Sequence, residues 1–330
     1  MPVIPALQAM LDTIPAQSEL QTTSLADQRK AALEGAANLA TAVAEEPRDV
    51  GAVTTAQVAV DGGHIQVRIY QPKNPGPHPI HIYYHGGGWM FGTIEDPFVD
   101  IACRERTALA GYVTVAVEYR LAPEHKFPIP LNDSYAALEW MVEHAAEFDA
   151  DPTRVTVGGG SAGGNLAAAV VLKARNENGP RITFQLLEIP AVDLTASSPS
   201  VEKYGTGEYP LSTTDLQTCL TAYLATPEDA TNEYASPLLA RDLTGLPPAH
   251  IMTSEYDVLQ DDGTRYAERL TAAGVEATLT LGTGHIHGSS QFTKLLPEAA
   301  AWRDEAIAQL IKHANRRSVA PCIASLHSPS

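Results

Sequence analysis

The chain has 330 residues, 44% of them hydrophobic, which suits one α/β domain with an insertion and a substantial core. Its formal net charge of −17 argues against nucleic acid or anionic lipid as a partner, and no apolar run is long enough to span a membrane. The three cysteines are widely spaced without a C-x-x-C pair, and no positive charge precedes Arg29, so we expect a cytoplasmic protein without a secretory signal, a disulfide framework or a metal site.

Residues 1–50 are predicted to form helices that pack on the main body. Ser24 and Asp27 resemble an N-terminal capping arrangement at the start of the longer helix. The apolar positions fall at helical spacing, which predicts one buried face on each segment. These positions are Leu7, Leu11 and Ile14 before Pro15, and Leu25, Leu33, Ala36, Leu39 and Val43 before Pro47.

Residues 51–194 and 246–316 are predicted to form the two parts of the core. The core opens with a β-hairpin, in which Val58–Val60 and alternating apolar positions from Ile65 flank a turn at Asp61. From Pro79 onward, buried strands alternate with helices, which implies a mostly parallel sheet covered on both faces. The expected strands are Ile80–Tyr84, Tyr112–Val117, Val155–Val157, Phe184–Ile189, His250–Thr253 and Ala277–Leu281, and the expected helices are Val99–Ala110, Ser134–His144, Leu166–Arg175, Thr264–Ala273 and Glu298–Lys312.

Residues 195–245 interrupt this alternation. They are polar, rich in Ser, Thr and Pro, and contain one expected helix near Thr214–Leu224. We interpret the segment as an insertion that covers the site, with Tyr204 and Tyr209 as candidate substrate contacts. The small, polar residues 317–330 are predicted to be disordered.

A serine stands in a glycine-rich turn between an expected strand and an expected helix. The run Gly159-Gly160-Ser161-Ala162-Gly163 matches the G-x-S-x-G nucleophile elbow. In this turn the nucleophile adopts a strained backbone conformation, and its neighbours need little or no side chain so that strand, helix and substrate can approach closely. The helix that follows adds backbone donors and partial positive charge where an oxyanion develops. Ser161 is therefore the predicted nucleophile.

A second glycine run, His85-Gly86-Gly87-Gly88-Trp89, follows a buried strand. Consecutive glycines expose backbone N–H groups, which suits a phosphate nest or an oxyanion hole. A phosphate loop is disfavoured because no G-K-[ST] follows and no glycine-rich turn opens a helix at dinucleotide spacing. We therefore predict that Gly86 and Gly87 are oxyanion donors together with Ala162, and that Trp89 contacts the substrate.

A serine nucleophile needs a base and a group that orients the base. Asp257 follows the fifth expected strand, His285 and His287 follow the sixth, and the order Ser, Asp, His is that of an α/β-hydrolase. Periodicity and composition do not choose between the two histidines. The glycine after His287 leaves room beside a crowded site and favours it, whereas His285 is expected to face solvent or a cap. Asp261 and Asp262 are interpreted as caps of the following helix.

These motifs together resemble the bacterial hormone-sensitive-lipase family of α/β-hydrolase carboxylesterases, over about residues 58–310. The resemblance implies Ser161 as nucleophile, His287 as base, Asp257 as its partner, and a helical cap built from residues 1–50 and 195–245. It also implies a homodimer. The motifs that carry it are His85–Trp89, Tyr119-Arg120-Leu121-Ala122-Pro123-Glu124-His125, Gly160–Asn165, Asp257–Gly263 and His287-Gly288.

Three residues depart from the family pattern. Gly160 stands where the family usually has Asp, so one supporting carboxylate is absent. Ser289 replaces an aromatic residue, which is expected to loosen the packing around the base. Glu188 lies in an otherwise apolar strand, where a buried carboxylate must be hydrogen-bonded or neutral.

The function predicted from these observations is hydrolysis of short- to medium-chain carboxylic esters, without cofactor or metal, through an acyl-enzyme. One alternative is hydrolysis of amides, carbamates or lactones by the same triad, because leaving-group protonation and pocket shape, not fold, separate these reactions. The other is a ligand-binding protein on the same fold that has lost a triad residue. Ser161, Asp257 and His287 are all present, which disfavours it.

Overall fold

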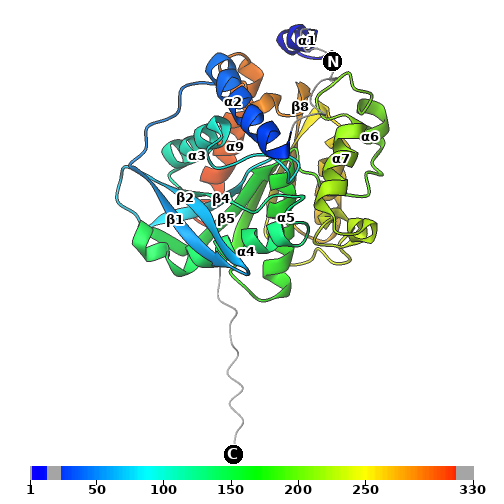
Figure 1. Cartoon of the computed structure of the whole chain (residues 1–330). Helices are drawn as coiled ribbons and strands as arrows, with labels where there is room; N and C mark the ends of the chain where they lie inside the picture. Colours follow the sequence, from blue (N-terminus) through cyan, green and yellow to red (C-terminus); the bar gives the residue numbers. More distant parts are fainter. Residues whose placement is uncertain (1, 13–23, 317–330) are drawn as a thin grey trace, which may run out of the picture.

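The computed structural model describes residues 2–12 and 24–316; Ile14 and the predicted disordered segment 317–330 lie outside the described residues. Eight strands form one sheet in the order β1-β2-β4-β3-β5-β6-β7-β8 (Figure 1). The hairpin β1–β2 and the pair β2–β4 are antiparallel, and every later pair is parallel, as expected of an α/β-hydrolase. The strands are β1 (Ala52–Val60), β2 (Gly63–Gln71), β3 (His78–Tyr84), β4 (Val113–Glu118), β5 (Ala150–Gly160), β6 (Ile182–Glu188), β7 (Ala249–Tyr256) and β8 (Ala277–Ile286).

Helices cover both faces of this sheet. The helices α4 (Ile129–Glu143), α5 (Ala162–Asn176) and α8 (Gln260–Ala272) pack on one face, and α3 (Pro97–Ala110) and α9 (Pro297–His313) pack on the other. Helix α5 is buried on nearly all sides because most of its side chains are small, which lets it lie close to β5. The α/β sandwich thus fixes the start of α5 at the end of β5.

The N-terminal helices α1 (Pro5–Leu11) and α2 (Leu25–Val43) form as expected. The Ser24 hydroxyl accepts the Asp27 N–H at 3.2 Å, which confirms the predicted cap of α2. Val43 at the end of α2 is buried against α3, and Leu7 of α1 is buried beside the end of β8. None of the helices within residues 2–12 and 24–316 has the length and hydropathy that a membrane span requires.

The segment 195–245 contains α6 (Pro199–Tyr204), α7 (Thr213–Tyr223), and the short 3₁₀ turns η3 (Pro227–Thr231) and η4 (Pro237–Leu239). The expectation of one helix was therefore incomplete. Its α6 was missed because six residues are too few to establish a helical period.

The interpretation of Asp261 and Asp262 as helix caps is wrong. The cap position of α8 is Leu259, so both carboxylates lie inside the first turn and reach across to residues 192–200. The buried Asp262 accepts the N–H groups of Val192 and Asp193 at 3.0 and 2.9 Å and the Ser198 hydroxyl at 2.6 Å. Burial raises the pKa of the Asp262 carboxyl to about 7. These carboxylates tie the start of the insertion to α8.

The turn between β5 and α5 has no room for larger residues at two of its glycines. A Cβ atom at Gly159 would lie 2.4 Å from the Tyr84 carbonyl oxygen, and one at Gly163 would lie 1.9 Å from the same atom. Each clash is between a Cβ atom and a backbone carbonyl oxygen. Neither atom moves when a side chain changes rotamer, so no rotamer change relieves the clash. The close approach of β3, β5 and α5 requires glycine here.

Gly163→Ala should lower the free energy of unfolding by about 3 kcal/mol or more, because overpacking against backbone forces the strands apart. Gly35→Ala is the matched control, since a Cβ there meets nothing within 4 Å and Gly35 lies inside the exposed part of α2. We expect this control to raise stability by about 0.5–1 kcal/mol. Urea unfolding measures both, and equal stability of the two variants would contradict the close approach.

Candidate active site

Three side chains from separate strand ends meet at one edge of the sheet. Ser161 follows β5, Asp257 follows β7 and His287 follows β8. His287 Nδ1 lies 2.7 Å from Asp257 Oδ2, and His287 Nε2 lies 3.1 Å from Ser161 Oγ. The structure therefore brings together all three predicted residues, and it places His287, not His285, beside the serine.

The buried Asp257 fixes the orientation of this imidazole. Its side chain is 1% exposed, and its Oδ1 accepts the Leu259 N–H at 2.9 Å, which leaves Oδ2 for the ring of His287. When Nδ1 carries the proton that Oδ2 accepts, Nε2 presents its lone pair to Ser161 Oγ. This geometry can take a proton from the serine hydroxyl as the oxygen attacks a substrate.

Ser161 adopts the strained backbone predicted for a nucleophile elbow, with φ 56° and ψ −118°. Its N–H is donated to the Glu188 carbonyl oxygen at 2.9 Å, and its own carbonyl accepts the Asn165 N–H at 3.0 Å as α5 begins. A non-glycine residue at positive φ is costly, so these bonds hold a conformation that the residue would otherwise leave. The side chain consequently projects at the N-terminus of α5.

Of the two predicted oxyanion glycines, Gly86 lies directly against this turn, and Gly87 lines the same cavity as Ser161. A Cβ atom at Gly86 would be 3.0 Å from the Gly160 carbonyl oxygen and 3.6 Å from Ser161 Cβ. Gly87 has φ +111°, and a Cβ there would be 2.3 Å from the Phe91 carbonyl oxygen. Substitution at Gly87 would therefore distort the loop and displace its N–H group.

Two aromatic contacts stabilise the loop that carries these glycines. Buried His85 stacks on Tyr119 with 4.3 Å between ring centroids, and the Tyr119 hydroxyl donates to the His85 carbonyl oxygen at 2.8 Å. Trp89 stacks on Tyr223 of α7 at 4.3 Å, with the rings 6° from parallel. The loop is thus fixed to both the core and the insertion.

A cavity of about 730 Å³ surrounds Ser161 and His287 and is lined mostly by apolar side chains. Its walls come from the glycine loop, α2 and the insertion, which lie at the same end of the sheet (Figure 1). Among the lining residues that sequence reasoning missed are Ala32, Leu33, Leu211, Leu216 and Cys219. The residues of α2 and α7 among them show only the spacing of an apolar helix face, because a residue that lines a cavity and one that fills a core share the same periodicity. Leu211 precedes α7.

The predicted substrate contacts differ in their positions. Trp89 lines the cavity, although its side chain is only 1% exposed. Tyr204 and Tyr209 are not among the lining residues and instead pack around Tyr256, at 5.6 and 5.2 Å between ring centroids. The structure does not support the prediction that these two tyrosines contact substrate, because they complete an aromatic cluster of their own.

His285, expected to face solvent or a cap, is buried, so the first of these two alternatives is wrong. Strand β8 remains paired with β7 as far as Ile286, so it continues beyond Leu281, where the expected strand ends. The His285 side chain lies 2.8 Å from the Ser289 hydroxyl and contacts the edge of Trp302, and burial lowers the pKa of its imidazole. Ser289 also accepts the Ile286 N–H at 3.1 Å, so it ties the turn around the base instead of loosening it.

Glu188 meets the requirement expected of a buried carboxylate. It forms an ion pair with Arg106 and accepts the Trp302 Nε1–H at 3.0 Å. Among residues 2–12 and 24–316, no group of three His, Cys, Asp or Glu side chains is arranged to hold a metal ion.

Residues 81–291 match a family model described as the alpha/beta hydrolase fold. Carboxylesterase NlhH of Mycobacterium tuberculosis is 36% identical over 313 residues, which cover 93% of this chain and 94% of that protein. Carboxylic ester hydrolase LipN of the same organism is 39% identical over 80% of this chain and 71% of that protein.

A solved structure has the same fold. The hyperthermophilic esterase from the archaeon Pyrobaculum calidifontis superposes with a TM-score of 0.89 and 35% identity, over 95% of this chain and 99% of that one. Together with the sequence relatives, this likeness confirms the resemblance that the motifs indicate. The chain therefore belongs to the hormone-sensitive-lipase-like family of α/β-hydrolase carboxylesterases.

Proposed function

We propose that the chain is a serine carboxylesterase that hydrolyses small esters with short to medium acyl chains. The observation that carries the proposal is the hydrogen-bonded series from Asp257 through His287 to Ser161. The carboxylesterases among the relatives support it. The cytoplasmic location and the homodimer stay predictions.

In the first half of the reaction, Ser161 Oγ attacks the ester carbonyl carbon while His287 Nε2 takes the hydroxyl proton. The N–H groups of Gly86, Gly87 and Ala162 donate hydrogen bonds to the carbonyl oxygen and stabilise the negative charge that develops on it. Asp257 stabilises the imidazolium, which then gives its proton to the departing alcohol as the acyl-enzyme forms.

In the second half, His287 takes a proton from water, and the resulting hydroxide attacks the acyl carbon. The same oxyanion donors stabilise the second tetrahedral intermediate, and its collapse releases the acid as Ser161 regains its proton. No step in this sequence requires a cofactor.

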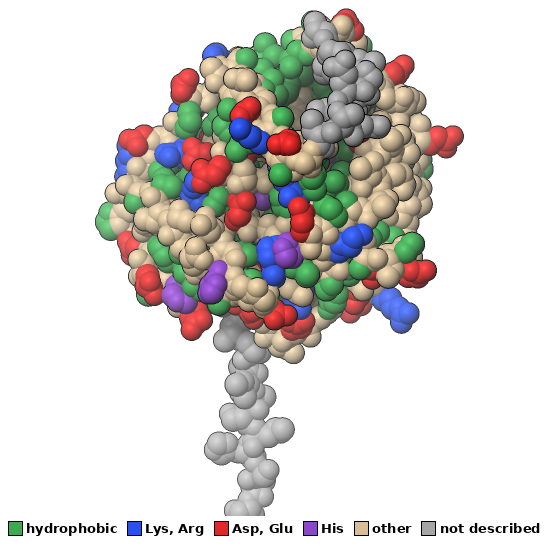
Figure 2. All heavy atoms as spheres, viewed as in Figure 1, with side chains coloured by type: hydrophobic (Ala, Val, Ile, Leu, Met, Phe, Trp, Pro, Cys, Tyr) green, Lys and Arg blue, Asp and Glu red, His purple; other side chains and the backbone are tan. Residues whose placement is uncertain are grey.

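The cavity supports the proposed substrate class. Helix α2 and residues 195–245 both contribute walls, and we propose that they form a cap over the site. The apolar lining favours uncharged acyl and alcohol groups. Figure 2 shows Asp and Glu side chains spread over the visible face with Lys and Arg side chains scattered among them and not gathered into a patch, an arrangement that does not favour nucleic acid.

Among p-nitrophenyl esters with two to sixteen acyl carbons, the short and medium chains should have the highest kcat/KM, because the capped cavity has a finite volume. EDTA should not change the rate. Matched p-nitroanilides should react far more slowly, since an amine leaving group needs fuller protonation. Palmitate as the best substrate, metal dependence, or faster anilide cleavage would contradict the proposal.

Ser161→Ala should lower kcat by at least about three orders of magnitude, because the oxyanion hole and binding alone give only residual catalysis. The variant should keep its melting temperature within a few degrees, since alanine retains Cβ and the change removes the Oγ atom that faces His287 in the cavity. Steady-state kinetics with the butyrate ester measure this effect. Near-normal activity in the folded variant would remove Ser161 from the mechanism.

His287→Ala should fall about as far as Ser161→Ala, and Asp257→Asn should fall severely because the imidazole then adopts the wrong tautomer. His285→Ala should lose stability by about 1–3 kcal/mol but keep kcat within about tenfold, because it removes a buried hydrogen bond without touching the serine. Kinetics and urea unfolding on the same preparations separate these outcomes. An active His287→Ala beside an inactive, folded His285→Ala would reverse the assignment.

A further inference from the structure

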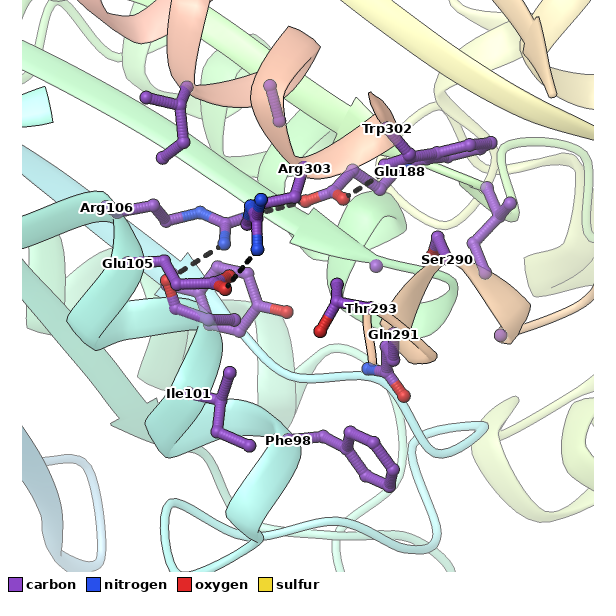
Figure 3. Close-up of a pocket in the computed structure, with 17 residues that line it drawn as sticks. Phe98, Ile101, Glu105, Arg106, Glu188, Ser290, Gln291, Thr293, Trp302 and Arg303 are labelled. Carbon is purple, nitrogen blue, oxygen red and sulfur yellow. Dashed lines mark hydrogen bonds and ion pairs between the residues drawn. The ribbon is translucent and has the colours of Figure 1, made fainter. Parts of the chain in front are cut away.

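A second and smaller cavity, of about 70 Å³, lies beside the turn that carries Ser161 (Figure 3). Its walls include Gly160 and Glu188, together with Arg106 from α3 and Trp302 from α9. A Cβ atom at Gly160 would have no neighbour closer than 3.9 Å, so this position leaves open the space that a side chain would fill. No side chain of the residue directly before Ser161 therefore packs against the serine turn.

Glu188 provides support from the neighbouring strand. It is paired with Gly160 across β5 and β6, and its carbonyl oxygen accepts the Ser161 N–H at 2.9 Å. The next residue, Ile189, has φ 42°, so the chain leaves β6 in a second strained turn. Both strained turns depend on where the backbone of Glu188 is held.

Both carboxylate oxygens of Glu188 are held by residues of α3 and α9, which pack on the face of the sheet opposite α5. Oε1 pairs with Arg106 Nη2, and Oε2 accepts the Trp302 Nε1–H at 3.0 Å. Figure 3 shows Arg106 and Trp302 converging on this carboxylate from α3 and α9. Arg106 is itself held, because it donates to the Ala102 carbonyl oxygen at 3.0 Å and lies 4.8 Å over the Tyr83 ring.

This ion pair is almost fully buried, with 6% of the Arg106 side chain and 14% of the Glu188 side chain exposed. Desolvation offsets most of the attraction in such a pair, and apolar residues of similar volume often give equal or greater stability. The ion pair therefore adds little to stability, and its effect is to fix the position of Glu188. Resting on the proposed function, we infer that Glu188 is a positioning residue for the nucleophile: Arg106 and Trp302 clamp its carboxylate, and its carbonyl in turn holds Ser161 at the attacking geometry.

The test removes the clamp without leaving a lone buried charge. In the double variant Arg106→Met, Glu188→Leu, kcat should fall about ten- to a hundredfold, the cost of a small displacement of a reacting group. KM should stay within about twofold, and phosphonate labelling of Ser161 should slow in parallel with kcat. The melting temperature should stay within a few degrees, because removing the desolvation cost of the ion pair offsets the Trp302 N–H that is left without an acceptor. A merely structural role for the pair would not combine such a small change in stability with lost activity.

The matched control is the ion pair of Asp151 and Arg154, whose side chains are each 13% exposed. This pair lies at the start of β5, and Ser161 follows the end of that strand. Arg154→Met, Asp151→Asn should leave kcat and the labelling rate unchanged. Trp302→Phe is a milder variant that keeps the ion pair and removes the donor to Glu188 together with part of the buried ring that contacts His285, and it should lower kcat several-fold at constant KM.

Wild-type kcat in the folded double variant would overturn the inference. If that variant fails to fold, unchanged kcat and labelling in Trp302→Phe would overturn it instead, and a several-fold loss would support it. A wild-type protein that hydrolyses no ester would contradict the proposed function, whereas the labelling rates of Ser161 would still decide the role of Glu188.

Discussion

The sharp turn between β5 and α5 is the constraint on which the candidate site depends. Gly159 and Gly163 allow β3, β5 and α5 to approach until the backbone atoms touch, and this closeness forces Ser161 into a positive-φ conformation. The same closeness places Gly86 against the serine turn. The proposed nucleophile, the proposed oxyanion donors and the start of α5 thus share one geometric cause, and loosening it would separate all three.

Buried carboxylates then attach the outlying parts to this turn. Asp257 receives a backbone N–H and orients the imidazole, while Asp262 receives two N–H groups and a hydroxyl and holds the start of the insertion. Glu188 differs because its own backbone carries the serine contact and its side chain is anchored by Arg106. These buried carboxylates act as local acceptors for backbone and side-chain donors. The strongly negative net charge of the chain gives no indication of this role, because it does not distinguish buried carboxylates from exposed ones.

Motifs whose residues are dictated by local backbone geometry were predictable from the sequence. The elbow, the glycine loop and the mostly parallel sheet follow from what close backbone approach and parallel pairing require, and the structure brings the predicted residues together. Contacts between distant segments were not predictable. Burial of His285 depends on how far β8 stays paired with β7, and the reach of Asp262 depends on where the insertion returns. Tyr204 and Tyr209 illustrate the same limit, because an aromatic residue in an insertion carries no sign of which side it faces.

The central claim is that one serine, activated by His287, forms a covalent intermediate. Intact-mass spectrometry after reaction with a p-nitrophenyl phosphonate, followed by peptide mapping, tests it most directly. The account predicts one phosphonyl group per chain, located on Ser161, with labelling nearly abolished in His287→Ala because the hydroxyl then lacks its base. A phosphonyl group on another residue, or equal labelling rates with and without His287, would contradict the account.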